Sequence, residues 1–210
     1  MSIICPTILA TDSHEYREQM ERVLPFAERI QIDVMDGIFA DKKSLPLSEV
    51  WIPEGVIADI HVMFKNPAEY IDTFKALQPN MVIVHAESDC DIPLFASQLR
   101  EAGIKTGVAV LSSTPVTDIE YVLPHVQHVL IFSGDLGNFG GTADLELAQK
   151  ATAVKTLNHY LEIGWDGGAN NDNCLQLAQA GIDVINVGSA IQKSPDPQST
   201  YATMRAKVTS

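Results

Sequence analysis

Short apolar segments recur at fairly even intervals along the chain, and polar segments of helical length separate them. Each apolar segment holds four to eight residues and is rich in Ile and Val, which is typical of strands covered on both faces. The pattern predicts strands at Ile3–Leu9, Ile30–Met35, Val56–Met63, Met81–His85, Thr106–Leu111, His128–Phe132, Tyr160–Trp165 and Val184–Val187.

Amphipathic segments fill the intervals between these strands. Their apolar residues recur at helical spacing, and Gly103 and Gly181 follow two of them, where helices commonly end. Between Phe39 and Glu54, two prolines and a charged run indicate a loop with one short helix. Helices are predicted at Tyr16–Leu24, Ala68–Leu77, Ile92–Ala102, Val116–Leu123, Leu145–Leu157 and Asn173–Ala180.

Strict alternation of strands and helices predicts an α/β fold with a parallel sheet. Eight strands in only 210 residues favour one (β/α)8 TIM barrel over residues 1–210. A doubly wound open sheet is the alternative, but no GxGxxG follows the first strand and no GxxxxGK[ST] motif occurs.

The charge balance narrows the choice of partner. The chain has 27 Asp and Glu residues and 14 Lys and Arg residues, which gives a net charge of −13. This negative charge argues against nucleic acid or an anionic membrane as a partner. A small anionic ligand stays possible because backbone amides can bind it locally. The three cysteines form no CxxC pair, and we see neither a signal peptide nor a membrane span, so we expect a cytoplasmic protein.

Polar side chains interrupt three of the predicted strands near their carboxyl ends, where barrel enzymes build their active sites. Gln31, Asp33 and Met35 share one face of the second strand by period-two alternation. His61 lies near the end of the third strand, and Asp166 comes directly after the seventh. Buried Gln and Asp side chains need partners, so we expect these groups to be paired or to bind a ligand.

Carboxylates on separate strands can approach a central ligand from different directions. Asp33 and Asp166 could therefore move a proton off one face of a carbon and onto the other. A metal ion between them could stabilise the negative oxygen that develops. Taken singly, each Asp is more often a helix cap or a loop hydrogen-bonding residue.

Glycine-rich loops follow the last three strands. One runs from Ser133 to Thr142, a second contains Gly167 and Gly168, and the third contains Gly188 and Ser189. Exposed backbone amides beside a helix amino terminus bind anions, and barrels often bind phosphate after strands seven and eight. These loops predict a phosphate site.

Several segments, in this order and spacing, resemble the ribulose-phosphate 3-epimerase family: Pro6–Leu9, Ile32–Gly37, Ile60–Met63, Val84–Glu87, Asn138–Gly141, Asp166–Gly168 and Val187–Ile191. The resemblance implies a phosphate-binding barrel that inverts C3 of ribulose 5-phosphate to give xylulose 5-phosphate through an enediolate. It also implies a divalent metal ion (Zn, Fe, Mn or Mg) and a homo-oligomer.

The resemblance assigns roles to individual residues. Asp33 and Asp166 would be the acid/base pair and also metal ligands, with His61 as a third ligand. Gln31 stands where the family has a ligating His, so we include it only as a doubtful fourth ligand. The substrate would contact Thr7, Met35, Met63, Gly140, Gly141, Gly167, Gly168, Gly188 and Ser189.

Other departures concern the mouth of the pocket. Ile38 replaces a His, and Phe132 occupies the position of a third Met. Three hypotheses stay open: an active 3-epimerase, a related barrel enzyme acting on another phosphorylated sugar, and a non-catalytic protein that binds a sugar phosphate.

Overall fold

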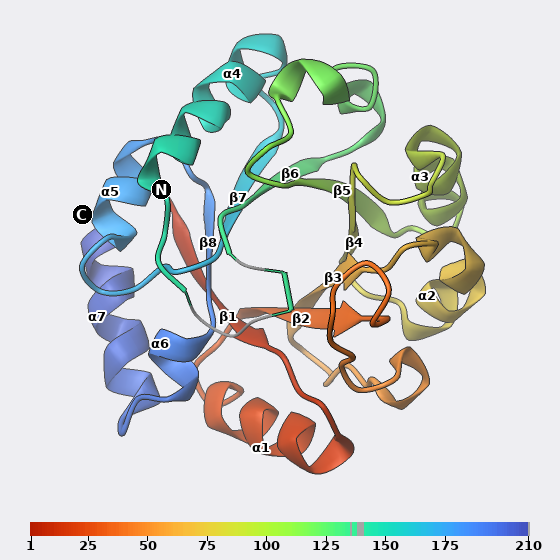
Figure 1. Cartoon of the computed structure of the whole chain (residues 1–210). Helices are drawn as coiled ribbons and strands as arrows, with labels where there is room; N and C mark the ends of the chain where they lie inside the picture. Colours follow the sequence, from red (N-terminus) through yellow and green to blue (C-terminus); the bar gives the residue numbers. More distant parts are fainter. Residues whose placement is uncertain (135, 138–140, 210) are drawn as a thin grey trace.

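The computed structural model describes residues 1–134, 136–137 and 141–209. Parallel strands pair in chain order, and the last strand pairs with the first, so the sheet closes into a barrel (Figure 1). The strands are β1 (Ile3–Ile8), β2 (Arg29–Met35), β3 (Ile57–Met63), β4 (Met81–His85), β5 (Lys105–Val110), β6 (His128–Phe132), β7 (Glu162–Asp166) and β8 (Val184–Val187). The predicted barrel is confirmed.

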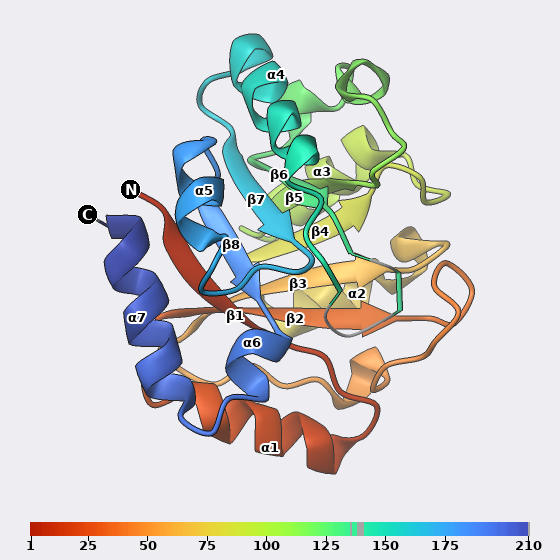
Figure 2. The ribbon, with the colours of Figure 1, turned by 60° about the vertical axis from the view of Figure 1, so that its left-hand side comes forward.

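Helices cover the outside of this barrel, and the two termini lie close together at one end of it (Figure 2). No helix among the described residues has both the length and the apolarity that a bilayer span requires. The α-helices are α1 (Ser13–Val23), α2 (Ile71–Leu77), α3 (Ile92–Glu101), α4 (Gln149–Leu157), α5 (Cys174–Gln179), α6 (Ser189–Gln192) and α7 (Pro197–Thr209). The 3-10 helices are η1 (Leu47–Glu49), η2 (Pro67–Tyr70), η3 (Val116–Ile119), η4 (Leu123–His125) and η5 (Leu145–Ala148).

Three details differ from the helices that the sequence predicts. The segment from Val116 to Leu123 is not an α-helix: it holds η3, a turn at residues 120–122 and the first residue of η4, and Pro124 within η4 has no amide hydrogen to extend a helix. The helices α2 and α4 each follow a 3-10 turn that the periodicity had merged with them. The sequence pattern did not predict α6 or α7. The helix α6 has only four residues, and α7 buries only Tyr201, Met204 and Val208, while most of its other residues are polar. Between Phe39 and Glu54, the loop with one short helix is confirmed, as η1.

The two faces of the sheet pack against different layers. Ile30, Ile32 and Val34 of β2 belong to the large core between strands and helices. Gln31 and Asp33 alternate with them and are 1% and 8% exposed, which places these polar groups on the inner face. The predicted alternation along β2 is therefore confirmed.

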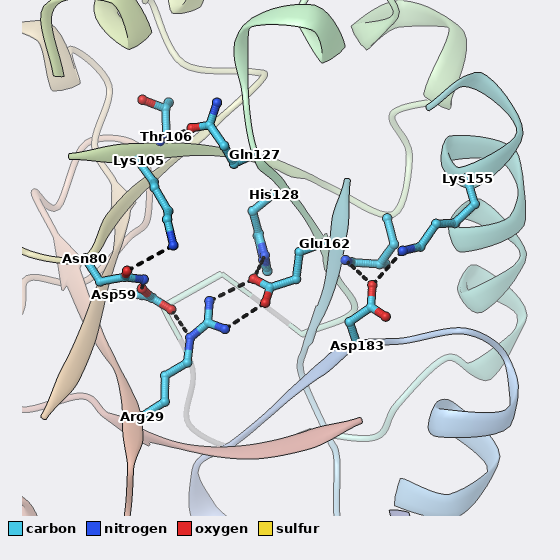
Figure 3. A network of polar contacts seen from close by, with 11 residues as sticks. Arg29, Asp59, Asn80, Lys105, Thr106, Gln127, His128, Lys155, Glu162 and Asp183 are labelled. Carbon is cyan, nitrogen blue, oxygen red and sulfur yellow. Dashed lines mark hydrogen bonds and ion pairs between the residues drawn. The ribbon is translucent and has the colours of Figure 1, made fainter. Parts of the chain in front are cut away.

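A polar network closes the barrel at the amino ends of the strands (Figure 3). Arg29 Nε donates to Asp59 Oδ2 at 2.6 Å, and its two terminal nitrogens each donate to Glu162 at 2.8 Å. Asn80 donates to the other oxygen of Asp59 at 2.6 Å, and His128 contacts Glu162 at 2.8 Å. Since charged pairs occupy this end, the carboxyl ends of the strands remain for a ligand site.

Candidate active site

Four polar side chains converge inside the barrel near the carboxyl ends of β2, β3 and β7. Gln31 Nε2 donates to Asp33 Oδ1 at 2.9 Å and to Asp166 Oδ2 at 2.6 Å. His61 Nδ1 lies 3.1 Å and 3.4 Å from the same two oxygens. Because β2 and β7 are not neighbours in the sheet, these contacts cross the interior of the barrel. The structure thus brings together all the polar groups that the strand ends predict.

Crowding of charge shifts the proton affinities in this cluster. Burial raises the pKa of Asp33, and the nearby carboxylate of Asp166 raises it further, while hydrogen bonds from His61 and Gln31 oppose both effects. Burial by itself would lower the pKa of His61, but its hydrogen bonds to Asp166 and Asp33 prevail and raise the pKa to about 9. A carboxyl group with a raised pKa suits proton transfer near neutral pH.

The same cluster has the donor set of a divalent metal site. Asp33, His61 and Asp166 each offer one ligand atom, and these atoms lie within 4.8 Å of one another. Two carboxylates and one imidazole suit Zn²⁺, Mn²⁺ or Fe²⁺. Gln31 presents its amide nitrogen to the carboxylates, so it could ligate a cation only after its amide turned its oxygen inward.

A cavity opens beside the two carboxylates. Thr7, Met63 and Phe132 form part of its wall. Glycine loops line another part of it, and a Cβ on Gly188 would come within 2.7 Å of Thr7 Oγ1. The predicted residues that line the cavity are Thr7, Asp33, Met63, Asp166, Gly167, Gly168, Gly188 and Ser189.

Two of the predicted substrate contacts are placed differently, and a third is not described by the structure. Met35 packs with Leu9 and Met63 in a small apolar cluster beside the cavity rather than among the residues lining it. Gly141 is exposed and is likewise not a lining residue, and Gly140 lies outside the described residues. A contact between these residues and a substrate stays a prediction.

Sequence reasoning missed residues that the structure places at the site. Asn186 of β8 lines the cavity and is only 3% exposed. A lone Asn in the apolar stretch Val184–Val187 is the same kind of signal as Asp33 in β2 and could have identified it. His85, the last residue of β4, is fully buried, and its Nε2 lies 2.9 Å from Nε2 of His61.

Solved structures with the same fold support this architecture. The 3-hexulose-6-phosphate synthase from Salmonella typhimurium superposes with a TM-score of 0.74 and 15% identity, over 99% of this chain and 98% of that chain. A phosphoribosyl anthranilate isomerase from Thermococcus kodakaraensis superposes with a TM-score of 0.68 and 16% identity, over 99% of both chains. At these identities the likeness concerns the fold alone.

Sequence comparison is more specific. The ribulose-phosphate 3-epimerase of Mycobacterium leprae (strain TN) is 32% identical, over 98% of this chain and 94% of the relative. That of Helicobacter pylori (strain J99 / ATCC 700824) is 31% identical, over 92% of both chains. The family model "Ribulose-phosphate 3 epimerase family" matches residues 3–192. These matches confirm the family resemblance and the enzyme class that it implies: the chain belongs to the ribulose-phosphate 3-epimerase family.

Proposed function

We propose that this protein is a sugar-phosphate 3-epimerase that inverts C3 of a ketose phosphate such as D-ribulose 5-phosphate, giving D-xylulose 5-phosphate. The observation that carries the proposal is the pair Asp33 and Asp166. They come from separate strands, share the donors Gln31 and His61, and both line one cavity beside glycine loops.

Inversion needs one proton acceptor and one proton donor on opposite faces of C3. One carboxylate takes the C3 proton, and the electron pair of the broken C–H bond enters an enediolate. The other carboxyl group, protonated, then returns a proton to the opposite face, and the roles exchange in the reverse reaction. Gln31 and His61 hold Oδ1 of Asp33 and Oδ2 of Asp166 in position, while the second oxygen of each carboxylate lies outside these contacts.

A divalent metal ion held by Asp33, His61 and Asp166 would supply positive charge that stabilises the enediolate oxygens. The phosphate group would lie against the glycine loops around Gly168 and Gly188, whose amides can bind an anion without a charged side chain. This arrangement reconciles an anionic substrate with a protein of net charge −13.

The wall of the cavity supports a second candidate, a related epimerase for another ketose phosphate. Phe132 is 7% exposed and lines the cavity, and its ring lies 5.7 Å from that of His61. A rigid aromatic ring beside the reacting groups would restrict which sugar fits. Assembly into a homo-oligomer stays a prediction from the family.

The test is exchange of the C3 proton of ribulose 5-phosphate with solvent deuterium, followed by NMR, with Mn²⁺, Fe²⁺ or Zn²⁺ supplied in turn. We expect exchange with at least one metal, and a loss of about 10²–10⁴-fold in Asp166→Asn. Asp172→Asn, which changes an exposed carboxylate in the loop that follows β7, should behave as the unmodified protein. Tight binding of the sugar phosphate without exchange under any metal would favour a non-catalytic binding protein, and exchange of another ketose phosphate alone would favour the second candidate.

A further inference from the structure

A chain of buried polar groups continues from His61 away from the two carboxylates. His61 Nδ1 faces Asp33 and Asp166, and its Nε2 faces Nε2 of His85 at 2.9 Å. On the far side of His85, Nδ1 lies 3.4 Å from Oε2 of Glu87. The line therefore runs from the candidate metal ligands through two imidazoles to a third carboxylate.

Nδ1 of His85 and Oε2 of Glu87 face each other, and each is the other's polar partner. Both histidine side chains are fully buried, and within the described part of the chain neither Nδ1 of His85 nor Oε2 of Glu87 has another hydrogen-bond partner. Buried polar atoms are nearly always paired in folded proteins. Phe39 and Phe132 pack against the ring of His85, with ring centroids 4.8 and 5.7 Å away, and so keep water from its faces.

The other oxygen of Glu87 is already engaged. Oε1 accepts a hydrogen bond from the Leu111 amide at 3.0 Å and another from the Thr114 hydroxyl. Burial would raise the pKa of Glu87, but hydrogen bonds from His85, Thr114 and Leu111 outweigh it and lower the pKa to about 2. Glu87 is thus an anchored carboxylate that can only accept a hydrogen bond from His85.

These contacts impose one order of protons. Because Glu87 only accepts, neutral His85 carries its proton on Nδ1 and accepts at Nε2. His61 must then donate from its own Nε2, so a metal ion can replace the proton that Nδ1 shares with Asp33 and Asp166 and bind the lone pair there. We propose, on the basis of the proposed function, that Glu87 and His85 are positioning residues that set the tautomer of His61 for metal binding.

The substitution Glu87→Gln tests this order with an isosteric side chain. The Leu111 amide needs an acceptor, so the Gln carbonyl oxygen takes the place of Oε1 and its NH2 group faces Nδ1 of His85. His85 must then accept at Nδ1 and donate from Nε2, and His61 must carry its proton on Nδ1. That proton occupies the position that a metal ion needs.

Two measurements without any sugar follow. Histidine ¹⁵N NMR of the metal-free protein should find His85 protonated on Nδ1 in the unmodified protein and on Nε2 in Glu87→Gln. Titration with Mn²⁺ should show affinity weakened by about 10–100-fold in Glu87→Gln, the range for loss of a group that orients a ligand. Circular dichroism of the metal-free variant at neutral pH should show a folded protein, since every hydrogen bond in the line keeps a donor and an acceptor.

The matched control is Thr114→Val, which removes a hydrogen bond to Glu87 but leaves Oε2 facing His85. It should bind Mn²⁺ as the unmodified protein does. A His85 proton on Nε2 in the unmodified protein, or equal Mn²⁺ affinity in Glu87→Gln, would overturn the proposal. If Glu87→Gln fails to fold, the NMR measurement of the His85 tautomer in the unmodified protein tests the proposal by itself. Because neither readout involves turnover, a failure of the epimerase assignment would be recognised separately, in the deuterium exchange.

Discussion

Replacing Arg29 by Met tests whether the charged network at the amino ends of the strands stabilises the barrel. Arg29 Nε donates to Asp59 at 2.6 Å, and the side chains of the two residues are 11% and 3% exposed. Met fills similar space but leaves Asp59 with Asn80 as its remaining side-chain partner in the network. Breaking a buried ion pair by removing one partner costs about 3–5 kcal/mol, because a charge stays buried without compensation.

Almost all of the expected loss of stability comes from Asp59, whose charge stays buried without its partner. Glu162, the other partner of Arg29, has a side chain that is 34% exposed and keeps its contact with His128, so solvent screens most of its loss. For a chain of this size, about 1 kcal/mol shifts the unfolding midpoint by about 2–4 °C. We therefore expect Arg29→Met to lower the midpoint by about 6–20 °C, as measured by circular dichroism, with a matching decrease in urea resistance.

Arg205→Met is the matched control at the same end of the barrel. Arg205 pairs with Glu28 at 3.3 Å, but the two side chains are 51% and 76% exposed, so the loss should stay below about 1 kcal/mol. In the double variant Arg29→Met with Asp59→Asn, no unpaired charge is buried, and much of the stability should return. Equal losses in Arg29→Met and Arg205→Met would refute the reasoning.

Three further predictions concern the site and its surroundings. Gly188→Ala places a Cβ 2.7 Å from Thr7 Oγ1, so steady-state kinetics should show a higher KM for the sugar phosphate with little change in the unfolding midpoint; an unchanged KM would remove this wall from the substrate site. Gly168→Ala should weaken binding of inorganic phosphate, measured by calorimetry, because φ is +70° and the new Cβ would lie 2.2 Å from the Ala143 nitrogen; undiminished binding would place the phosphate elsewhere. The pKa of Glu87 falls from its ordinary 4.5 to about 2 on folding, so its carboxylate stabilises the fold above pH 4.5, and this stabilisation disappears as the pH falls toward 2. Urea unfolding at a series of pH values should show that the free energy of unfolding falls less steeply with acid in Glu87→Gln than in the unmodified protein. Parallel curves for the two proteins would contradict the lowered pKa of Glu87.

Much of the fold could be predicted because the periodicity of this sequence is local physical information. Apolar segments of strand length alternate with amphipathic segments, and this order leaves a closed parallel barrel as the favoured architecture. The same alternation placed Gln31 and Asp33 on one face of β2, which the structure confirms. The terminal helix α7 escaped notice because three buried residues in thirteen give too weak a signal.

The candidate site also has a part that could be predicted from the sequence and a part that could not. The strand ends that carry carboxylates and imidazoles can be identified from the order of residues alone, since a polar residue in an apolar strand stands out wherever the strand lies. The folded barrel was needed to see that the Gln31 amide faces Asp166 across the interior and that His85 lies against His61. Contacts across the interior depend on how the strands tilt and close into a ring, and no local pattern along one strand encodes the position of a strand on the other side.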